Sequence, residues 1–273
     1  MKKHLLLFVF AVAGFGLSWA QNAEIDQIKA LFAERHIKEK LEECIKLCEA
    51  SLTKEVNYDV AVYLSRAYYF KGETEPDKNI KLDIFLKGVD AGEKALSKVK
   101  AYTDAMSSTK KEEDAIKKVT KEDIEGLYWV AANLARYAKF APFGKKLAVK
   151  GRVRYLWDHV LATAPEFNYG GVYRFFGGYF ALVPSITGEQ DPAKSKEMFD
   201  KGVAVAPHYL ETKVLYAEAY CTHAKIKNKE LFNQLLDEVL ATDISQWPEI
   251  YPENLNAQNK AKELKAKQAE FFD

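Results

Sequence analysis

The chain has 273 residues, of which 48% are hydrophobic and 29% are charged, and its formal net charge is +1. This composition is typical of a globular protein and excludes collagen-like, low-complexity and disordered chains. With this net charge, no global charge favours nucleic acid or an anionic membrane surface as a partner. Aromatic residues make up 13% of the chain, enough to fill a core or line a site.

The first twenty residues have the pattern of a secretory signal peptide. A basic start over residues 1–4 is followed by an uninterrupted apolar run over residues 5–16. Ser18 and Ala20 supply the small residues that signal peptidase requires, so we expect cleavage after Ala20 and export from the cytoplasm. The alternative, an uncleaved anchor, is weaker because the apolar run is short for a membrane span. Gln21 follows the cut, so no lipoprotein cysteine is predicted there.

The three cysteines, Cys44, Cys48 and Cys221, are too few for a disulfide-stapled scaffold. Cys44 and Cys48 are four residues apart on a predicted helix, where a disulfide would have poor geometry. A zinc site needs four ligands, and Cys221 with His223 adds only two from a distant segment. We therefore interpret the cysteines as core thiols and predict neither a metal nor a cofactor.

Apolar residues recur every three or four positions, which predicts helices. Such stripes cover residues 41–52, 60–68 and 127–138, and breaks fall at glycine and proline between them. No stretch alternates with the period of two that strands show. The sequence therefore predicts an all-α fold that forms a single helical-repeat domain over residues 21–273.

Several windows resemble the helix pairs of tetratricopeptide repeats. Ser65, Gly177 and Ala217 occupy the slot where a small side chain lets two helices approach, with aromatic residues one turn away. Pro165 and Pro207 close two units but lie 42 residues apart, against 34 in the standard repeat. We therefore expect an irregular tetratricopeptide-like stack, an α-α superhelix, with a helix over residues 255–271 capping its C-terminal end.

One helix carries the first candidate binding cluster, Tyr128, Trp129, Asn133, Arg136 and Tyr137. Trp129, Asn133 and Tyr137 follow one another at four-residue spacing and share a face. An asparagine between aromatic residues suits a ligand site that is mostly apolar with few polar groups. The alternative is a core asparagine whose hydrogen bonds are satisfied among packed rings.

The second candidate cluster consists of Tyr169, Gly170, Gly171, Tyr173, Arg174 and Tyr179. Two glycines at a helix start leave backbone N–H groups open to an anion, and Arg174 would add a bidentate partner. The alternative is a tight loop in which glycine permits positive φ and Arg174 pairs with an acid. A third pair, Lys213 and Tyr216, is better explained as ordinary repeat positions.

No catalytic motif stands out. The sequence lacks His-Glu-x-x-His, Gly-x-Ser-x-Gly and a glycine-rich phosphate loop. Asp158 and His159 are adjacent on a predicted helix and therefore do not face each other. We expect a protein that is not an enzyme; a hydrolase using His159 and His208 is the weaker alternative.

The sequence resembles the T component of tripartite ATP-independent periplasmic (TRAP) transporters. The segments that carry the resemblance are Glu125–Tyr137, Tyr169–Gly178 leading to Pro184, Leu210–Ala217 and Pro252–Ala257. The resemblance covers most of the chain after residue 20, and none of its motifs is catalytic. The family often has a lipoprotein cysteine at the cleavage site, whereas this chain has Gln21.

The resemblance implies an all-helical protein with cryptic tetratricopeptide-like repeats. It implies a partner, the periplasmic solute-binding subunit of a TRAP transporter, and a homotrimer with a cavity or channel in each protomer. We therefore expect a periplasmic adaptor that holds a small organic or lipid-like ligand in an internal cavity. The alternative is a scaffold for envelope protein complexes that has no small-molecule site.

Overall fold

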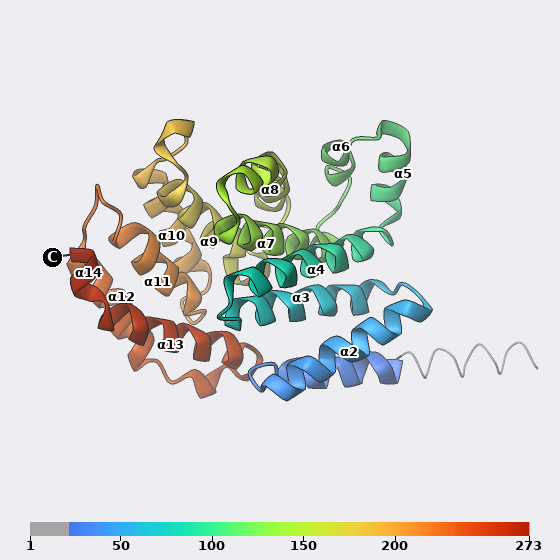
Figure 1. Cartoon of the computed structure of the whole chain (residues 1–273), viewed down its shortest axis with the longest axis horizontal. Helices are drawn as coiled ribbons and strands as arrows, with labels where there is room; N and C mark the ends of the chain where they lie inside the picture. The colour runs from blue at the N-terminus through green and yellow to red at the C-terminus, as the bar shows by residue number, and fades with distance from the viewer. Residues whose placement is uncertain (1–21, 273) are drawn as a thin grey trace, which may run out of the picture. The chain divides into compact units, whose positions relative to one another are not determined.

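The computed structural model describes residues 22–272, and the regular secondary structure in this range is helical throughout (Figure 1). The all-α prediction is therefore confirmed, while the predicted signal peptide lies outside the described residues. The chain divides into two compact units, Met1–Leu156 and Trp157–Asp273, called unit 1 and unit 2 below. The boundary falls within helix α8 (Phe143–Thr163). One helical-repeat domain over residues 21–273 stays a prediction.

Unit 1 is built from antiparallel helices that pack in chain order. It contains a helix over residues 22–33, α2 (Lys38–Lys54), α3 (Tyr58–Thr74), α4 (Lys78–Leu96), α5 (Lys100–Thr109), α6 (Glu112–Ile116), α7 (Ile124–Phe140) and the first part of α8. Helix α2 packs on α3, α3 on α4, and α4 on α7 (Figure 1). The Asp77 side chain caps α4 by accepting from the N–H groups of Asn79 and Ile80 at 2.8 and 3.0 Å.

Unit 2 repeats this pairing with shorter elements. It contains α9 (Phe167–Leu182), η1 (Ser185–Thr187), α10 (Pro192–Val205), α11 (Glu211–Leu215), the π-helix η2 (Tyr216–Cys221), α12 (Lys229–Ala241), η3 (Ile244–Gln246), η4 (Pro248–Ile250), α13 (Tyr251–Ala266) and α14 (Gln268–Phe272). Helix α10 packs on α9, and α12 on α13. Asp191 caps α10 by accepting from the Lys194 N–H at 3.0 Å, and Pro192 occupies the first turn, where no N–H is needed.

The two units share one packing device. In unit 1 the fully buried ring of Phe85 lies against Gly72, where an added Cβ would be 2.5 Å from the ring. In unit 2 the fully buried ring of Phe199 lies against Gly177, with a corresponding distance of 2.8 Å. Glycine is required at both places because any side chain would overlap the ring. The predicted close approach at Gly177 is thus confirmed, whereas Gly178 has no atom near its Cβ position.

A short sequence repeat underlies this device. Both phenylalanines start the pattern Phe-x-Lys-Gly-Val, at Phe85–Val89 and Phe199–Val203, and both lie eight residues after the capping aspartate. The glycine of each pattern touches a third helix. Gly88 approaches Asn133 of α7, and Gly202 approaches Thr212 of α11. Each unit therefore contains a helix pair and a third helix seated on the glycine of the second.

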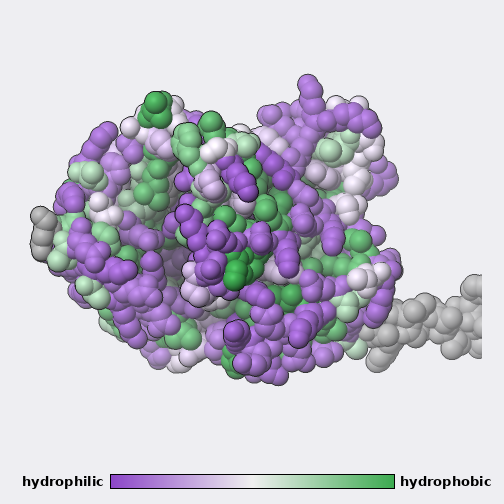
Figure 2. Space-filling model, viewed as in Figure 1, coloured by the Kyte–Doolittle hydropathy of each residue, from purple (hydrophilic) through white to green (hydrophobic). Residues whose placement is uncertain are grey.

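The C-terminal helix is confirmed as α13. It buries Ala257, Ala261 and Leu264 and exposes Lys262 and Glu263 between them. This one-sided burial fits a helix that covers the end of a stack. Hydrophilic residues cover most of the molecular surface on the face that Figure 2 shows.

Candidate functional site

Asn133 of the first cluster joins three helices of unit 1. Its fully buried Nδ2 donates to the Trp129 oxygen at 2.9 Å and to the oxygen and hydroxyl of Ser65 at 3.2 and 3.1 Å. The Ser65 hydroxyl donates to the Gly88 oxygen at 2.6 Å. Asn133 Oδ1 has no partner and lies against Gly88, where a Cβ would be 2.2 Å away. The amide nitrogen of Asn133 has its hydrogen bonds satisfied, as in the core-asparagine alternative. The amide oxygen has no hydrogen-bond partner.

Trp129 packs among aromatic rings and a guanidinium from α3. Its ring meets Tyr128 and Tyr69 edge to face, at centroid distances of 5.0 and 5.4 Å. The Arg66 guanidinium carbon lies 5.6 Å from its centroid, within cation–π range. Trp129 Nε1 and Arg66 Nε are both buried donors without a hydrogen-bond partner. An unpaired buried donor costs about 1–3 kcal/mol, so this place suits a water molecule or an acceptor group.

Arg136 lies on the same side of α7 as these rings. Its Nη2 is 3.1 Å from Glu73 Oε2, and its Nε donates to the Tyr69 hydroxyl at 3.0 Å. The structure thus places Trp129 and Arg136 around Tyr69. Tyr137 is buried one turn after Asn133, with 7% of its surface exposed.

Sequence reasoning missed the α3 side of this cluster. Arg66, Tyr69 and Glu73 follow one another at spacings of three and four residues, so they share a helix face. An aromatic residue between two opposite charges on one face was the signal available. Both charges of α3 pair with residues of α7: Glu73 with Arg136, and Arg66 with Glu125, whose Oε1 lies 3.4 Å from the guanidinium.

The second cluster is built around a left-handed turn at the start of α9. Asn168, Tyr169 and Gly170 have φ of 49°, 57° and 68°. This conformation costs a residue other than glycine about 1–2 kcal/mol. Arg174, with 6% of its surface exposed, donates to the Tyr169 oxygen at 2.6 Å and the Asn168 oxygen at 2.9 Å. The buried guanidinium therefore stabilises the turn through two charge-assisted hydrogen bonds.

The remaining contacts of this turn correspond to the tight-loop alternative. Gly170 has the positive φ that glycine permits, and its N–H donates to the Glu166 oxygen at 3.1 Å. Arg174 Nε lies 3.8 Å from Glu211 Oε2, so the arginine pairs with an acid. Anion binding by the two glycines and Arg174 stays a prediction.

A series of stacked rings continues from the turn. Tyr169 stacks on Tyr209 at 4.8 Å and meets His208 edge to face at 5.9 Å. His208 stacks on Trp247 at 5.4 Å, and the Arg174 guanidinium carbon lies 4.2 Å from the Tyr209 centroid. Tyr169, His208 and Trp247 are half-buried, so part of each ring faces solvent. His208, named above for the hydrolase alternative, lies within this stack.

Tyr173 and Tyr179 lie on other parts of α9. Tyr179 is half-buried, and its hydroxyl donates to Glu189 Oε2 at 2.5 Å. Tyr173 is half-buried beside Gly170. His159, the other histidine of the hydrolase alternative, lies on α8 with its Nε2 3.2 Å from the Thr163 hydroxyl.

Lys213 and Tyr216 have partners within unit 2. Lys213 Nζ lies 2.9 Å from Glu238 Oε2, and this hydrogen bond lowers the pKa of the Glu238 carboxyl. The Tyr216 hydroxyl donates to Asp200 Oδ1 at 3.0 Å, while its ring stacks on Phe199 at 4.8 Å. Burial raises the pKa of Tyr216, so the phenol stays neutral. These contacts are those of packed repeat positions.

The cysteines are buried with free thiols, as predicted for core residues. Two causes raise the pKa of the Cys48 thiol far above its ordinary value: the hydrogen bond with Cys44, which has the larger effect, and burial. Burial raises the pKa of the Cys221 thiol to about 12. The thiols of Cys48 and Cys221 are therefore weak nucleophiles and weak metal ligands near neutral pH.

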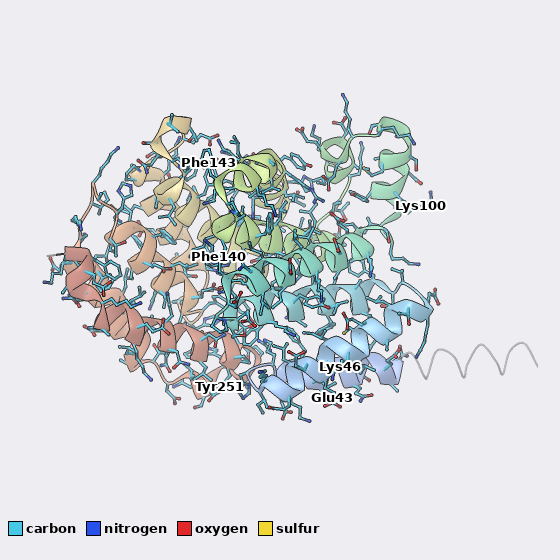
Figure 3. The ribbon with its side chains drawn as sticks, viewed as in Figure 1. Glu43, Lys46, Lys100, Phe140, Phe143 and Tyr251 are labelled. Carbon is cyan, nitrogen blue, oxygen red and sulfur yellow. The ribbon has the colours of Figure 1, made fainter. Side chains whose placement is uncertain are left out.

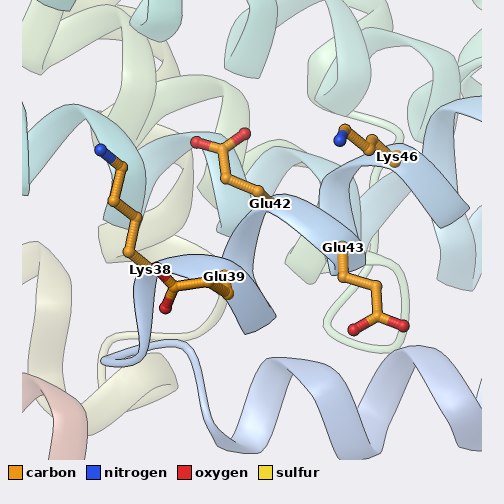
Figure 4. A pocket seen from close by; sticks show the side chains of 5 residues that line it. All are labelled: Lys38, Glu39, Glu42, Glu43 and Lys46. Atoms are coloured by element: carbon orange, nitrogen blue, oxygen red, sulfur yellow. The ribbon is translucent and has the colours of Figure 1, made fainter.

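A further hollow lies on α2 of unit 1. It is lined by Lys38, Glu39, Glu42, Glu43 and Lys46. Figure 4 shows Glu42 pointing with the two lysines to one side of the helix and Glu43 pointing to the other. Glu42 is also paired with Lys71 of α3 at 2.6 Å. The charged side chains of the hollow do not point toward one common place, and the Glu42 carboxylate is already paired with Lys71. The hollow therefore does not form a ligand site. The internal cavity that we expected from the family resemblance stays a prediction.

The comparisons with known proteins identify the family. Residues 72–272, about three-quarters of the chain, match the model of the TAtT family, the TRAP transporter T-component. The match spans α4, α7 and all of unit 2, and so includes both candidate clusters and both Phe-x-Lys-Gly-Val patterns. A comparison with curated proteins finds no match. No helix among residues 22–272 is both long and apolar enough to span a bilayer. The chain belongs to the TRAP transporter T-component family, which implies association with a TRAP transporter.

Proposed function

We propose that the protein is a periplasmic, non-enzymatic adaptor that binds the solute-binding subunit of a TRAP transporter. The observation that carries the proposal is the family match over residues 72–272. The paired-helix architecture supports it, because stacked helix pairs present extended binding surfaces. The signal-peptide pattern of residues 1–20 supports export to the compartment where a solute-binding subunit works.

Cross-linking in intact periplasm tests the partner. The tagged protein is cross-linked, captured and analysed by mass spectrometry, with a tagged periplasmic protein of similar size as control. We expect a TRAP solute-binding subunit to be enriched over the control. Enrichment of several envelope proteins without such a subunit would favour the scaffold alternative and overturn the adaptor. Light scattering of the purified protein tests the homotrimer, which we include in the proposal.

The proposal includes a small organic or lipid-like ligand, and each cluster, taken within its own unit, is a candidate place for its binding. The unpaired donors Trp129 Nε1 and Arg66 Nε support a ligand acceptor group at the first cluster. Arg136 and Tyr69 add further polar groups there, so a carboxylate or carbonyl oxygen is the expected acceptor. At the second cluster, the half-buried ring of Tyr169 beside Arg174 supports contact with a flat or apolar ligand.

Ligand-dependent thermal shifts across a panel of organic acids and lipids test this binding. A ligand at one hundred times its dissociation constant stabilises the protein by about 2.7 kcal/mol. Trp129→Phe removes the indole N–H donor together with part of the ring and should abolish the shift. Trp157→Phe, at another buried tryptophan, is the matched control and should keep it. Tyr169→Leu tests the second cluster in the same way. A shift that survives both cluster variants would remove these residues from the site, and no shift with any ligand would favour the scaffold.

A further inference from the structure

The segment from Lys139 to Arg154 differs in charge from the rest of the chain. It contains six basic residues and no acidic ones, in a protein whose net charge is +1. Two of the six, Lys145 and Lys146, form no ion pair within residues 22–272. Arg152 does: its guanidinium lies 2.6 Å from Glu93 and 2.5 Å from Glu112. Arg152 thus has two carboxylate partners, whereas Lys145 and Lys146 in the first turn of α8 have none among the described residues.

The same segment exposes large apolar side chains. Phe143 and Leu147, at the start of α8, have 68% and 58% of their surface exposed. They are four residues apart, and Lys150 follows three residues later, so all three share one face. The buried face of α8 is carried by later residues, Val153 and Leu156. We call Phe143, Leu147 and the lysines at 145, 146 and 150 the α8 patch.

The surroundings of the α8 patch are either open space or further aromatic and basic side chains. A Cβ added at Gly144 or Gly151 would have no atom within 4 Å, so these sides of the helix face open space. Phe140 precedes the patch at the end of α7 and is half-buried (Figure 3). Lys81 of α4 lies above its ring, with Nζ 4.6 Å from the centroid. The ring of Phe140, with the Lys81 ammonium above it, therefore lies shortly before the patch in the sequence.

We infer that the α8 patch docks the protein on an anionic lipid surface. A helix that combines lysines with exposed phenylalanine and leucine binds at a bilayer interface, with its apolar side chains inserted among the headgroups. The patch has three lysines, and the segment 139–154 that contains it has six basic residues, within the four to eight that are typical of recognition of anionic lipid. Protein interfaces, in contrast, are depleted in lysine, so an acidic protein is the less favoured occupant. This peripheral docking goes beyond the adaptor function.

Vesicle co-sedimentation tests the docking. The exported, processed protein is mixed with vesicles of phosphatidylcholine alone or with added phosphatidylglycerol, at low and high salt. We expect binding only to the anionic vesicles and a loss of binding at high salt, because the lysine contribution is screened. All variants are exported and processed in the same way, so they share one N-terminus. Binding that is absent, or equal on both kinds of vesicle, overturns the inference.

Matched variants assign the binding to α8. Each lysine near an anionic surface strengthens binding about fivefold, so Lys145→Glu with Lys146→Glu should weaken it by at least about twentyfold. Lys118→Glu with Lys121→Glu makes the same charge change at exposed residues elsewhere in unit 1 and should have a much smaller effect.

The apolar part of the patch has its own pair of variants. Phe143→Ala with Leu147→Ala should weaken binding by about tenfold. Ile186→Ala, at an apolar residue that is 90% exposed in unit 2, should leave it unchanged. Equal losses in patch and control variants would overturn the assignment to α8. So would patch variants that bind vesicles normally but lose a cross-linked protein partner, because the occupant would then be that protein.

Discussion

Units 1 and 2 use the same glycine–phenylalanine contact but complete it differently. In unit 1 the glycine of the Phe-x-Lys-Gly-Val pattern meets the buried amide of Asn133, which hydrogen-bonds across to α3. In unit 2 the equivalent Gly202 meets a methyl group of Thr212, at 3.1 Å from an added Cβ. Thr212 Oγ1 is also buried without a partner, as is Asn133 Oδ1. The helix pair is therefore the conserved element between the units, and the third helix is the variable one.

The difference teaches how an irregular repeat keeps its geometry. The ring of Phe85 or Phe199 sets the spacing within each pair, because it needs glycine opposite. The third helix then only has to fill the groove beside the second glycine, and either an amide or a threonine does so. A repeat of this kind tolerates different third helices, including the π-helical continuation η2 in unit 2.

Loss of either phenylalanine gives the largest expected effect. Phe85→Ala and Phe199→Ala each remove a fully buried ring and leave a cavity opposite a glycine, which has no side chain to fill it. We expect each substitution to lower the free energy of unfolding by about 3–5 kcal/mol. Peptide-resolved hydrogen exchange measures the loss in each unit separately.

Leu86→Ala, at an exposed leucine adjacent to Phe85 on α4, is the control and should cost much less. If one phenylalanine could be removed at little cost while the other could not, the two contacts would not be equivalent. The shared device would then be a coincidence of sequence.

The second glycine of each pattern should separate the units. The Cβ of Gly88→Ala would lie 2.2 Å from Asn133 Oδ1, so the buried amide must move and its hydrogen bonds weaken. We expect a loss of about 2–3 kcal/mol. Gly202→Ala meets its nearest atom at 3.1 Å and gains up to about 1 kcal/mol of helix propensity. We therefore expect it to stay within about 1 kcal/mol of the parent protein in denaturant unfolding.

A double-mutant cycle identifies the cause. Asn133→Ala removes the group that clashes, so Gly88→Ala should cost much less in that background than alone. An undiminished cost would show that α3 or the helix backbone, and not the Asn133 amide, sets the limit at Gly88. The proposed difference between the third helices would then fail.

The fold was largely predictable because its signals are local. The stripe at Val60, Leu64, Ala67 and Tyr68 is buried as its spacing predicts. The repeat was harder to place, because Pro165 and Pro207 point to two units in the second half of the chain, whereas the counterparts of Phe199 and Gly202 are Phe85 and Gly88 in the first half. The signal was the lysine–glycine–valine run, which a pattern based only on large and small residues passes over.

The candidate site was less predictable because it depends on contacts between helices. The spacing of Trp129 and Asn133 showed that they share a face of α7, and not that the face points to α3. The role of Arg174 could be narrowed to two choices, but its acidic partner Glu211 is distant in sequence. The tight-loop alternative placed positive φ at glycine, and nothing in the sequence indicated that Asn168 and Tyr169 would adopt it as well.

The smallest effect concerns how the third helix is anchored at its N-terminus. In unit 1 the Tyr58 hydroxyl accepts from the Gly126 N–H and donates to the Asp123 oxygen, both at 3.0 Å. In unit 2 the amide of Asn254 accepts from the Leu210 N–H at 3.0 Å. Tyr58→Phe should lower the free energy of unfolding by about 1–2 kcal/mol at pH 8.

Only the anchor in unit 1 can ionise, so alkaline pH should distinguish the units. Burial raises the pKa of Tyr58 to about 12, from an ordinary value of 10. Folding therefore favours the neutral phenol, and its contribution is complete below pH 10 and is lost as the pH rises through 12. The difference in unfolding free energy between the parent protein and Tyr58→Phe should shrink over that range. The difference for Asn254→Ala should not, because an amide does not titrate there. Taking differences cancels the other buried tyrosines, so a Tyr58→Phe difference that is constant with pH would mean that its hydroxyl does not anchor α7.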